Sequence, residues 1–129
     1  MSLSAEEPSL ARPGSVSYLH IPIGDRRSTA SFYGEVFGWS IRDPDADSPG
    51  FTDGSGHVIG HFVTDQAVAG DSGVRPYIYV DDVRATVERI TAHGGSVRKQ
   101  PFAEGKLTVA LFGDPAGNVL GVWQFGLSS

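Results

Sequence analysis

The sequence contains an internal repeat, and no other feature constrains the fold as strongly. Moving the chain against itself by 57 positions places Ile21 on Ile78 and Gly38 on Gly95. A repeat of this length indicates two copies of one supersecondary unit that cannot bury its apolar surface alone. The chain has 129 residues, the usual size of one domain, so we expect both copies to build a single domain.

The first copy spans residues 16–64. Apolar and polar residues alternate over 16–23, which predicts a strand. Asp25 is predicted to cap the following helix, whose apolar positions recur at three- and four-residue spacing, and Gly38 is predicted to end it. Strand-like segments follow at 39–42, 50–52 and 57–64, and Asp53 to Gly56 mark a turn.

The second copy repeats this order over residues 74–125. Residues 77–80 predict a strand, and Asp81 or Asp82 is predicted to cap a helix that ends before Gly94 and Gly95. Three further strands are expected at 96–99, 107–112 and 118–125, with a turn at 114–117. Each copy therefore contains one strand, one helix and three strands.

This organisation predicts an α+β fold of two tandem βαβββ modules, in which curved mixed sheets enclose a cleft and one helix packs on each sheet. The modules are residues 16–64 and 74–125, joined by a linker at 65–73 within one domain at 16–127. Residues 1–15 are expected to form a disordered leader. The cleft is the expected ligand site, because one helix cannot cover both faces of a sheet.

Composition argues against several classes of partner. Ten Lys and Arg residues against fifteen Asp and Glu residues give a net charge of −5, which disfavours binding to nucleic acid. The apolar runs are far shorter than the ~20 residues that a membrane span requires. The absence of Cys removes disulfides and thiolate chemistry and is compatible with a reducing compartment. We therefore expect a cytoplasmic protein that does not associate with membranes.

Several motifs carry a family resemblance: Ile21–Asp25, Ser31–Trp39, Tyr79–Asp82, Asp114–Asn118 and Gly121–Gln124. In this order they resemble the vicinal oxygen chelate superfamily, which includes glyoxalase I, bleomycin-resistance proteins and extradiol dioxygenases. The resemblance covers about residues 16–125. It implies the duplicated fold and a homodimer, but it leaves the activity open, because the superfamily contains isomerases, dioxygenases, fosfomycin-modifying enzymes and non-catalytic drug binders.

The resemblance also implies where a metal would bind in the catalytic members. Their four ligand positions look like Tyr18, Gly60, Arg75 and Gly121 in this sequence. None of these residues is a good ligand, because Gly has no side chain, Arg offers only donors and a neutral phenol binds divalent ions poorly. If Gly60 faces the cleft, His57 and His61 face away from it. The sequence therefore predicts no metal and no cofactor.

Strand parity predicts an aromatic cleft with a cation and an imidazole, suited to a planar or anionic small molecule. The predicted ligand-binding residues are Tyr18, His20, Arg75, Tyr77, Tyr79 and Trp123. Each has a plainer alternative. His20 can be a hydrogen-bonded interior residue, Arg75 can pair with Asp81 or Asp82 at the surface, and the aromatic residues can fill the core or a dimer contact.

Three functions remain open at this point. The first is a superfamily member that binds a small aromatic or anionic molecule without the usual metal. The second is an enzyme, either a glyoxalase-like lyase with a shifted metal set or a metal-independent catalyst with His20 as general base. The third is a regulatory module that binds a protein partner through its aromatic surface.

Overall fold

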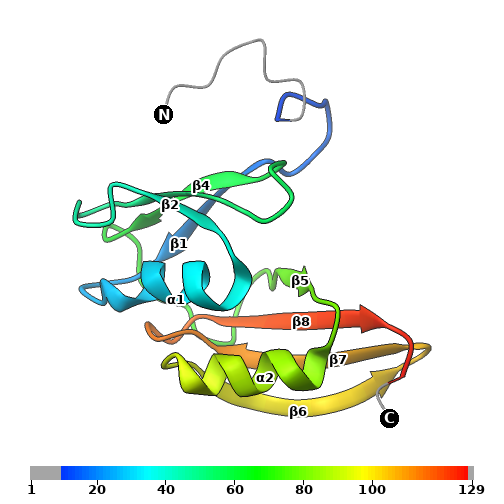
Figure 1. Ribbon diagram of the computed structural model, residues 1–129. Helices are drawn as coiled ribbons and strands as arrows, with labels where there is room; N and C mark the ends of the chain where they lie inside the picture. The colour runs from blue at the N-terminus through cyan, green and yellow to red at the C-terminus, as the bar shows by residue number, and fades with distance from the viewer. Residues whose placement is uncertain (1–9, 128–129) are drawn as a thin grey trace. The chain divides into compact units, whose positions relative to one another are not determined.

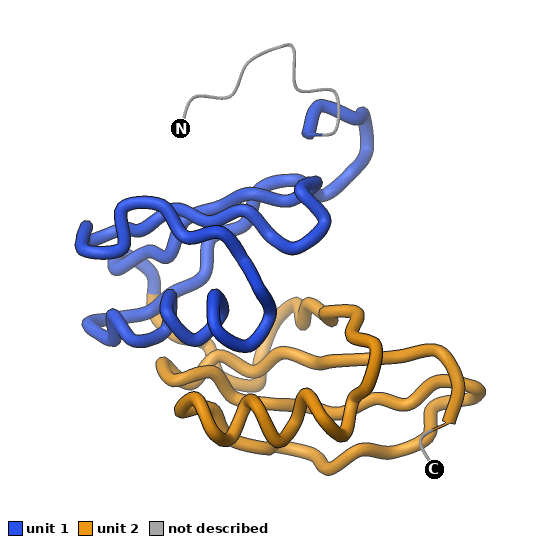
Figure 2. The backbone as a smooth tube through the Cα atoms, in the orientation of Figure 1, with its two compact units in different colours: residues 1–66 blue, residues 67–129 orange. Residues whose placement is uncertain are grey.

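The computed structural model describes residues 10–127, which divide into a first unit ending at Gln66 and a second unit beginning at Ala67 (Figures 1 and 2). Each unit is a four-stranded mixed sheet with one helix, so the predicted α+β fold of tandem βαβββ modules is confirmed. The first nine residues of the predicted leader lie outside the described residues. The predicted cleft between the sheets and the domain boundaries stay predictions.

The first unit follows the predicted order of one strand, one helix and three strands. Its elements are β1 (Tyr18–Pro22), α1 (Ser28–Phe37), β2 (Ser40–Arg42), β3 (Gly50–Thr52) and β4 (Ile59–Val63). The sheet order is β1-β4-β3-β2, with β1 parallel to β4 and the other pairs antiparallel. Because a parallel pair needs a long connection, α1 and the β2–β3 hairpin lie between its two strands in the sequence.

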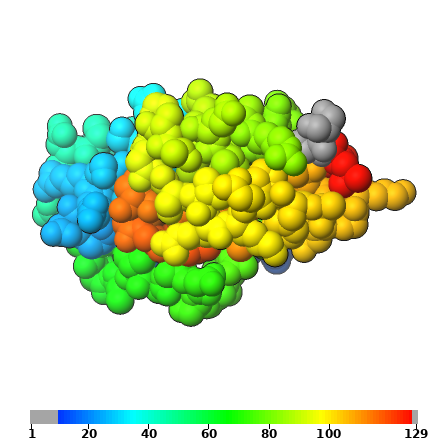
Figure 3. Space-filling model, turned by 90° about the horizontal axis from the view of Figure 1, so that it is seen from below, coloured from blue at the N-terminus to red at the C-terminus, as the bar shows by residue number. Residues whose placement is uncertain are grey.

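The second unit has the same topology. Its elements are β5 (Tyr77–Tyr79), α2 (Val83–Ala92), β6 (Ser96–Glu104), β7 (Leu107–Gly113) and β8 (Val119–Phe125), in the sheet order β5-β8-β7-β6. Figure 3 shows α2 and β6 side by side at the surface of this unit, with the turn between β6 and β7 projecting from it. No helix within residues 10–127 is long and apolar enough to cross a membrane.

The two units fill their helix-facing cores with different side chains. In the first unit, Trp39 stacks between Tyr33 and Phe51, with ring centroids 4.7 and 4.9 Å away, and Phe51 contacts Phe62 at 5.0 Å. In the second unit, the fully buried side chains that face the helix are mostly aliphatic and come from α2, β7 and β8: Val83, Ile90, Phe112 and Val122. The aromatic residues of the second unit are therefore left largely for its other face.

The helix ends agree only partly with the prediction. Gly38 ends α1 in the left-handed conformation, at φ 72°, and Asp82 caps α2 by accepting a hydrogen bond from the backbone N–H of Ala85 at 3.1 Å. The predicted cap at Asp25 is wrong. Because the chain makes a further turn after Asp25, α1 begins at Ser28 and its cap position is Arg27, which makes no side-chain cap.

Strand β6 is longer than predicted. The sequence indicated residues 96–99, whereas the strand continues through Pro101 to Glu104. Proline removes one backbone donor and is disfavoured in the interior of a sheet. It is tolerated because β6 is an edge strand whose pairing with β7 shifts register between Lys99 and Phe102.

Candidate ligand-binding site

Four aromatic side chains gather where β5 and β8 run in parallel, on the face of the sheet opposite α2. The Trp123 ring meets Tyr79 at 5.1 Å and Phe125 at 4.9 Å, both edge to face. The exposed fractions of Tyr77, Tyr79 and Phe125 are 44%, 50% and 70%. These four residues form what we call the aromatic platform: Tyr77, Tyr79, Trp123 and Phe125. Exposed rings in such an arrangement can stack on a planar ligand.

Gly121 allows the Tyr77 ring to lie flat across β8. The two residues pair in register, and a Cβ atom on Gly121 would stand 2.3 Å from ring carbons of Tyr77. Such a distance is impossible for real atoms, so any larger residue would displace the ring. From the sequence, Gly121 was predicted only to lack a metal-binding side chain, whereas in the structure this absence makes room for a ring of the platform.

Arg75 lies beside the platform. Its guanidinium donates a hydrogen bond to the Asp71 carboxylate, and its hydrogen bonds with Tyr77 and Asp71 raise the pKa of Arg75. The predicted surface pair with Asp81 or Asp82 is wrong in its partner. Arg75 pairs instead with Asp71, which lies four residues earlier in the chain. Arg75 thus presents a positive charge next to an exposed aromatic ring.

In the first unit, Tyr18 and His20 lie on one face of β1, as strand parity predicted. The hydroxyl of Tyr18 is 2.8 Å from Nδ1 of His61, and the Tyr18 ring packs edge-on against His20 at 5.3 Å. The register of β1 and β4 places His20 directly beside His61. These three side chains form a polar cluster on the face of the sheet opposite α1. His20, the candidate general base, is exposed there.

The expected orientation of β4 is wrong. A Cβ atom on Gly60 would stand 2.5 Å from the ring of Phe51, which is fully buried in the core beneath α1. Gly60 therefore faces the helix, and His61 faces the opposite side together with Tyr18. His57 does not belong to the strand but lies in the exposed turn before it.

The register of the second unit identifies the equivalent of His61. The pair His20 and His61 in the first unit corresponds to Tyr77 and Gly121 in the second, so His61 replaces Gly60 at the superfamily position. The four positions then hold one imidazole, one phenol, one guanidinium and one glycine. This donor set does not fit a divalent ion, and no group of three His, Asp or Glu residues within 10–127 is placed to hold one.

The pKa of His61 is lowered by its surroundings. Partial burial, followed by the charges of Arg42 and His20, lowers the pKa of His61 below the ordinary value of 6.5. The imidazole of His61 is therefore favoured in its neutral form, which can accept the proton of the Tyr18 hydroxyl at Nδ1.

This shift predicts a contribution of His61 to the pH dependence of stability. The unfolded chain binds the proton more readily than the folded chain, so the stabilising contribution is present above pH 6.5 and is lost as the pH falls through the folded pKa. We expect the free energy of unfolding, measured with urea at several values between about pH 5 and 8, to fall toward acid. His61→Asn should reduce this fall, whereas His57→Asn in the exposed turn is the matched control. An equal fall in both variants would contradict the prediction.

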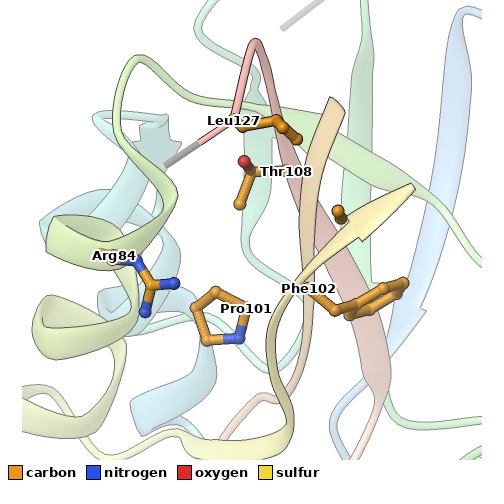
Figure 4. A pocket seen from close by; sticks show the side chains of 6 residues that line it. Arg84, Pro101, Phe102, Thr108 and Leu127 are labelled. Carbon is orange, nitrogen blue, oxygen red and sulfur yellow. The ribbon is translucent and has the colours of Figure 1, made fainter. Parts of the chain in front are cut away.

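A separate hollow lies within the second unit, between the first turn of α2 and the irregular part of β6. It has a volume of about 190 Å³ and is lined by Arg84, Pro101, Phe102, Ala103, Thr108 and Leu127. In Figure 4, Arg84 points toward Pro101, while the ring of Phe102 extends away from it. Ligand sites for drug-sized molecules measure roughly 300–1,000 Å³, so this hollow is a weaker candidate than the platform.

Three residues of the platform and of the polar cluster were not predicted from the sequence. Phe125 extends the platform, and His61 and Arg42 complete the polar side of the first unit. Phe125 could have been found from its even spacing with Trp123 along one strand. His61 could have been found by placing Phe62 in the core, because neighbouring residues of a strand face opposite sides.

Comparison with known proteins agrees with this architecture. Residues 20–123 match the family model of the glyoxalase-like domain, and the chain belongs to this family. It is 33% identical over 89 residues to a glyoxylase-like domain-containing protein of Didymella fabae, covering 64% of this chain and 70% of that protein.

One further relative is named for anthracycline biosynthesis, and one solved structure of similar fold is described as an antibiotic binding protein. The chain is 26% identical over 133 residues to the anthracycline biosynthesis protein DnrV of Streptomyces peucetius, covering 89% of this chain and 48% of DnrV. It thus spans about half the length of that relative. The solved structure of TnmS3, an antibiotic binding protein from Streptomyces sp. CB03234, superposes with a TM-score of 0.68 at 23% identity, covering 88% of this chain and 97% of TnmS3. This likeness supports the fold.

Proposed function

We propose that the protein binds a small planar aromatic molecule on the aromatic platform, without a divalent metal, and that Arg75 favours ligands that carry an anionic group. The observation that carries this proposal is the pairing of Gly121 with Tyr77. At the position where catalytic superfamily members hold a metal ligand, this chain has no side chain, and an aromatic ring lies across the vacant place. A glycine beside a tyrosine ring favours stacking of an aromatic ligand over coordination of a metal ion.

The composition of the face supports the same proposal. Tyr77 and Tyr79 are about half exposed although they are large rings, and the rings of Tyr79, Trp123 and Phe125 contact one another. Because these rings are exposed, a planar ligand can stack on them. DnrV is named as an anthracycline biosynthesis protein and TnmS3 as an antibiotic binding protein, and an anthracycline contains the kind of planar ring system that such a face accommodates.

The proposal is tested with two planar probes, 2-naphthoate and its neutral analogue 2-naphthamide. We expect both to change the tryptophan fluorescence of the protein, and we expect the response to be lost in Trp123→Phe, which leaves Trp39 in place. Arg75→Gln should weaken 2-naphthoate several-fold and leave 2-naphthamide almost unchanged, since a charge-assisted hydrogen bond contributes only to the anion. The fluorescence titration is repeated with doxorubicin as a larger planar ligand.

Two results would contradict this function. The first is binding that persists unchanged when Trp123 is replaced by Phe and Tyr79 by Ala, because the ligand would then occupy another part of the molecule. The second is one tightly held divalent ion per chain in dialysed protein, since the residues at the four superfamily positions would then have to be supplemented by other ligands.

A further inference from the structure

A row of basic side chains crosses the whole sheet of the first unit. Arg42 pairs with Gly50, Gly50 pairs with His61, and His61 pairs with His20, so four strands contribute one residue each. Residues paired in register project on the same face of a sheet. The row therefore brings one guanidinium and two imidazoles to the face opposite α1, with the hydroxyl of Tyr18 beside them.

Because Gly50 has no side chain, the guanidinium of Arg42 can lie over it, between Arg42's own strand and His61. A Cβ atom on Gly50 would stand 2.8 Å from Nη2 and 3.2 Å from Nε of Arg42, so the guanidinium lies over the glycine backbone. It is held there because Nη1 donates to Oγ1 of Thr52 at 2.8 Å and Nη2 donates to the carbonyl of Phe51 at 3.2 Å. The charge of Arg42 is thus fixed over the sheet, on the His61 side.

The charges around His61 are of one sign. Arg42 and His20 both lower the pKa of His61, as positive neighbours do, and partial burial acts in the same direction. Tyr18 is the neutral group that faces His61 from β1. A site in which every neighbouring charge opposes protonation of an imidazole is a site in which an added anion would be stabilised.

We propose that Arg42, His61 and His20, together with the Tyr18 hydroxyl, form a subsite for the oxyanion of a small carboxylate, and that His61 takes up one proton when the anion binds. The carboxylate accepts hydrogen bonds from the Tyr18 hydroxyl and the basic side chains, and the proton that His61 gains comes from solvent. No other bond forms or breaks. The subsite uses residues of the first unit alone, so it does not depend on the aromatic platform.

Proton uptake has a measurable consequence. An anion next to His61 favours the imidazolium form, and by linkage the imidazolium form favours the anion. The affinity for a carboxylate should therefore rise as the pH falls from about 8 to about 6, by no more than about tenfold per pH unit for a single proton. A neutral ligand of the same shape should show no such dependence.

The test uses unmodified protein with benzoate as the probe and benzamide as its neutral analogue. We expect the NMR titration of the His61 ring to move to higher pH in benzoate and to stay in place in benzamide. We expect calorimetry to show benzoate affinity several-fold higher at pH 6 than at pH 8. Heats of binding measured in buffers of different ionisation enthalpy should show net proton uptake, of less than one proton per benzoate bound. Equal affinity at both pH values, or an unmoved His61 titration at saturating benzoate, would overturn the proposal.

Variants separate the contributions of the row. His61→Asn keeps a polar partner for Tyr18 but cannot titrate, so benzoate binding should lose its pH dependence. Arg42→Met should weaken benzoate about tenfold and shift the free His61 titration to higher pH, because a positive neighbour has been removed. His57→Asn is the matched control and should match the parent protein. Retention of the full pH dependence in His61→Asn would also overturn the proposal.

The two proposals fail independently. Binding at the subsite is measured by the NMR titration of His61, and binding at the platform is measured by the fluorescence of Trp123. Benzoate that shifts His61 without changing Trp123 fluorescence supports the subsite by itself. Naphthalene probes that quench Trp123 while no carboxylate shifts His61 leave the platform supported and overturn the subsite.

Discussion

Gly60→Ala is expected to lower the free energy of unfolding by about 3 kcal/mol, which is a large effect for the addition of one methyl group. The new Cβ atom would stand 2.0 Å from the backbone carbonyl oxygen of Leu19 and 2.5 Å from the ring of Phe51. The carbonyl belongs to β1, the neighbouring strand of the sheet, and Phe51 is packed between Trp39 and Phe62, so neither can move freely. Urea denaturation followed by circular dichroism measures the change.

Gly54→Ala is the matched control for this substitution. It lies in the same unit, and its added Cβ atom would meet nothing nearer than the carbonyl of Phe37 at 3.8 Å. We expect its free energy of unfolding to stay within about 0.5 kcal/mol of the parent value. A Gly60→Ala protein as stable as Gly54→Ala would mean that Gly60 does not face the core, and the assignment of His61 to the opposite face would fall with it.

Gly121→Ala is expected to cost little stability but to weaken the binding of 2-naphthoate and 2-naphthamide by about tenfold or more. The reason is that the displaced Tyr77 ring can no longer stack on the ligand. The added Cβ atom would stand 2.3 Å from the Tyr77 ring, which is nearly half exposed and can rotate away into solvent. The platform would lose its first ring while the core beneath α2 stays intact. Fluorescence titration measures the affinity, and thermal denaturation measures the stability.

Gly113→Ala provides the comparison for Gly121→Ala. Gly113 lies on β7, and its added Cβ atom would meet Ser96 and Arg98 side-chain atoms rather than a platform ring. We expect affinity for the neutral 2-naphthamide to stay at the parent value. The double variant Gly121→Ala with Tyr77→Ala should bind no more weakly than Tyr77→Ala alone, because the clash has been removed. If the losses of affinity in Gly121→Ala and Tyr77→Ala added up in the double variant, Gly121 would affect binding independently of the Tyr77 ring.

The parts of the fold that depend on local spacing could be predicted from the sequence. The repeat predicted the βαβββ order, Gly38 predicted the end of α1, and the alternation around Tyr77 and Tyr79 predicted one face of β5. The cap at Asp25 and the early end of β6 were wrong, since a helix start and an edge-strand bulge depend on how the flanking chain packs.

The candidate site could be predicted only in part. Tyr18, His20, Tyr77, Tyr79 and Trp123 each lie on the face of their own sheet that strand parity indicated. Gly60 and Gly121 were treated as equivalent, although their absent side chains face opposite sides of their sheets. The partnership of Tyr18 with His61 joins strands 43 residues apart, and the partnership of Arg42 with His61 passes through Gly50 on a third strand.

The sequence by itself determined the duplicated module, the order of its elements and the aromatic character of β5 and β8, because these follow from repeats and from a side-chain period of two within one strand. The tertiary structure decided which residues meet across strands. Register between distant strands is set by turns and core packing, and a shift of one residue exchanges every side chain between the two faces. For this reason His61, rather than Gly60, lies beside Tyr18 and His20.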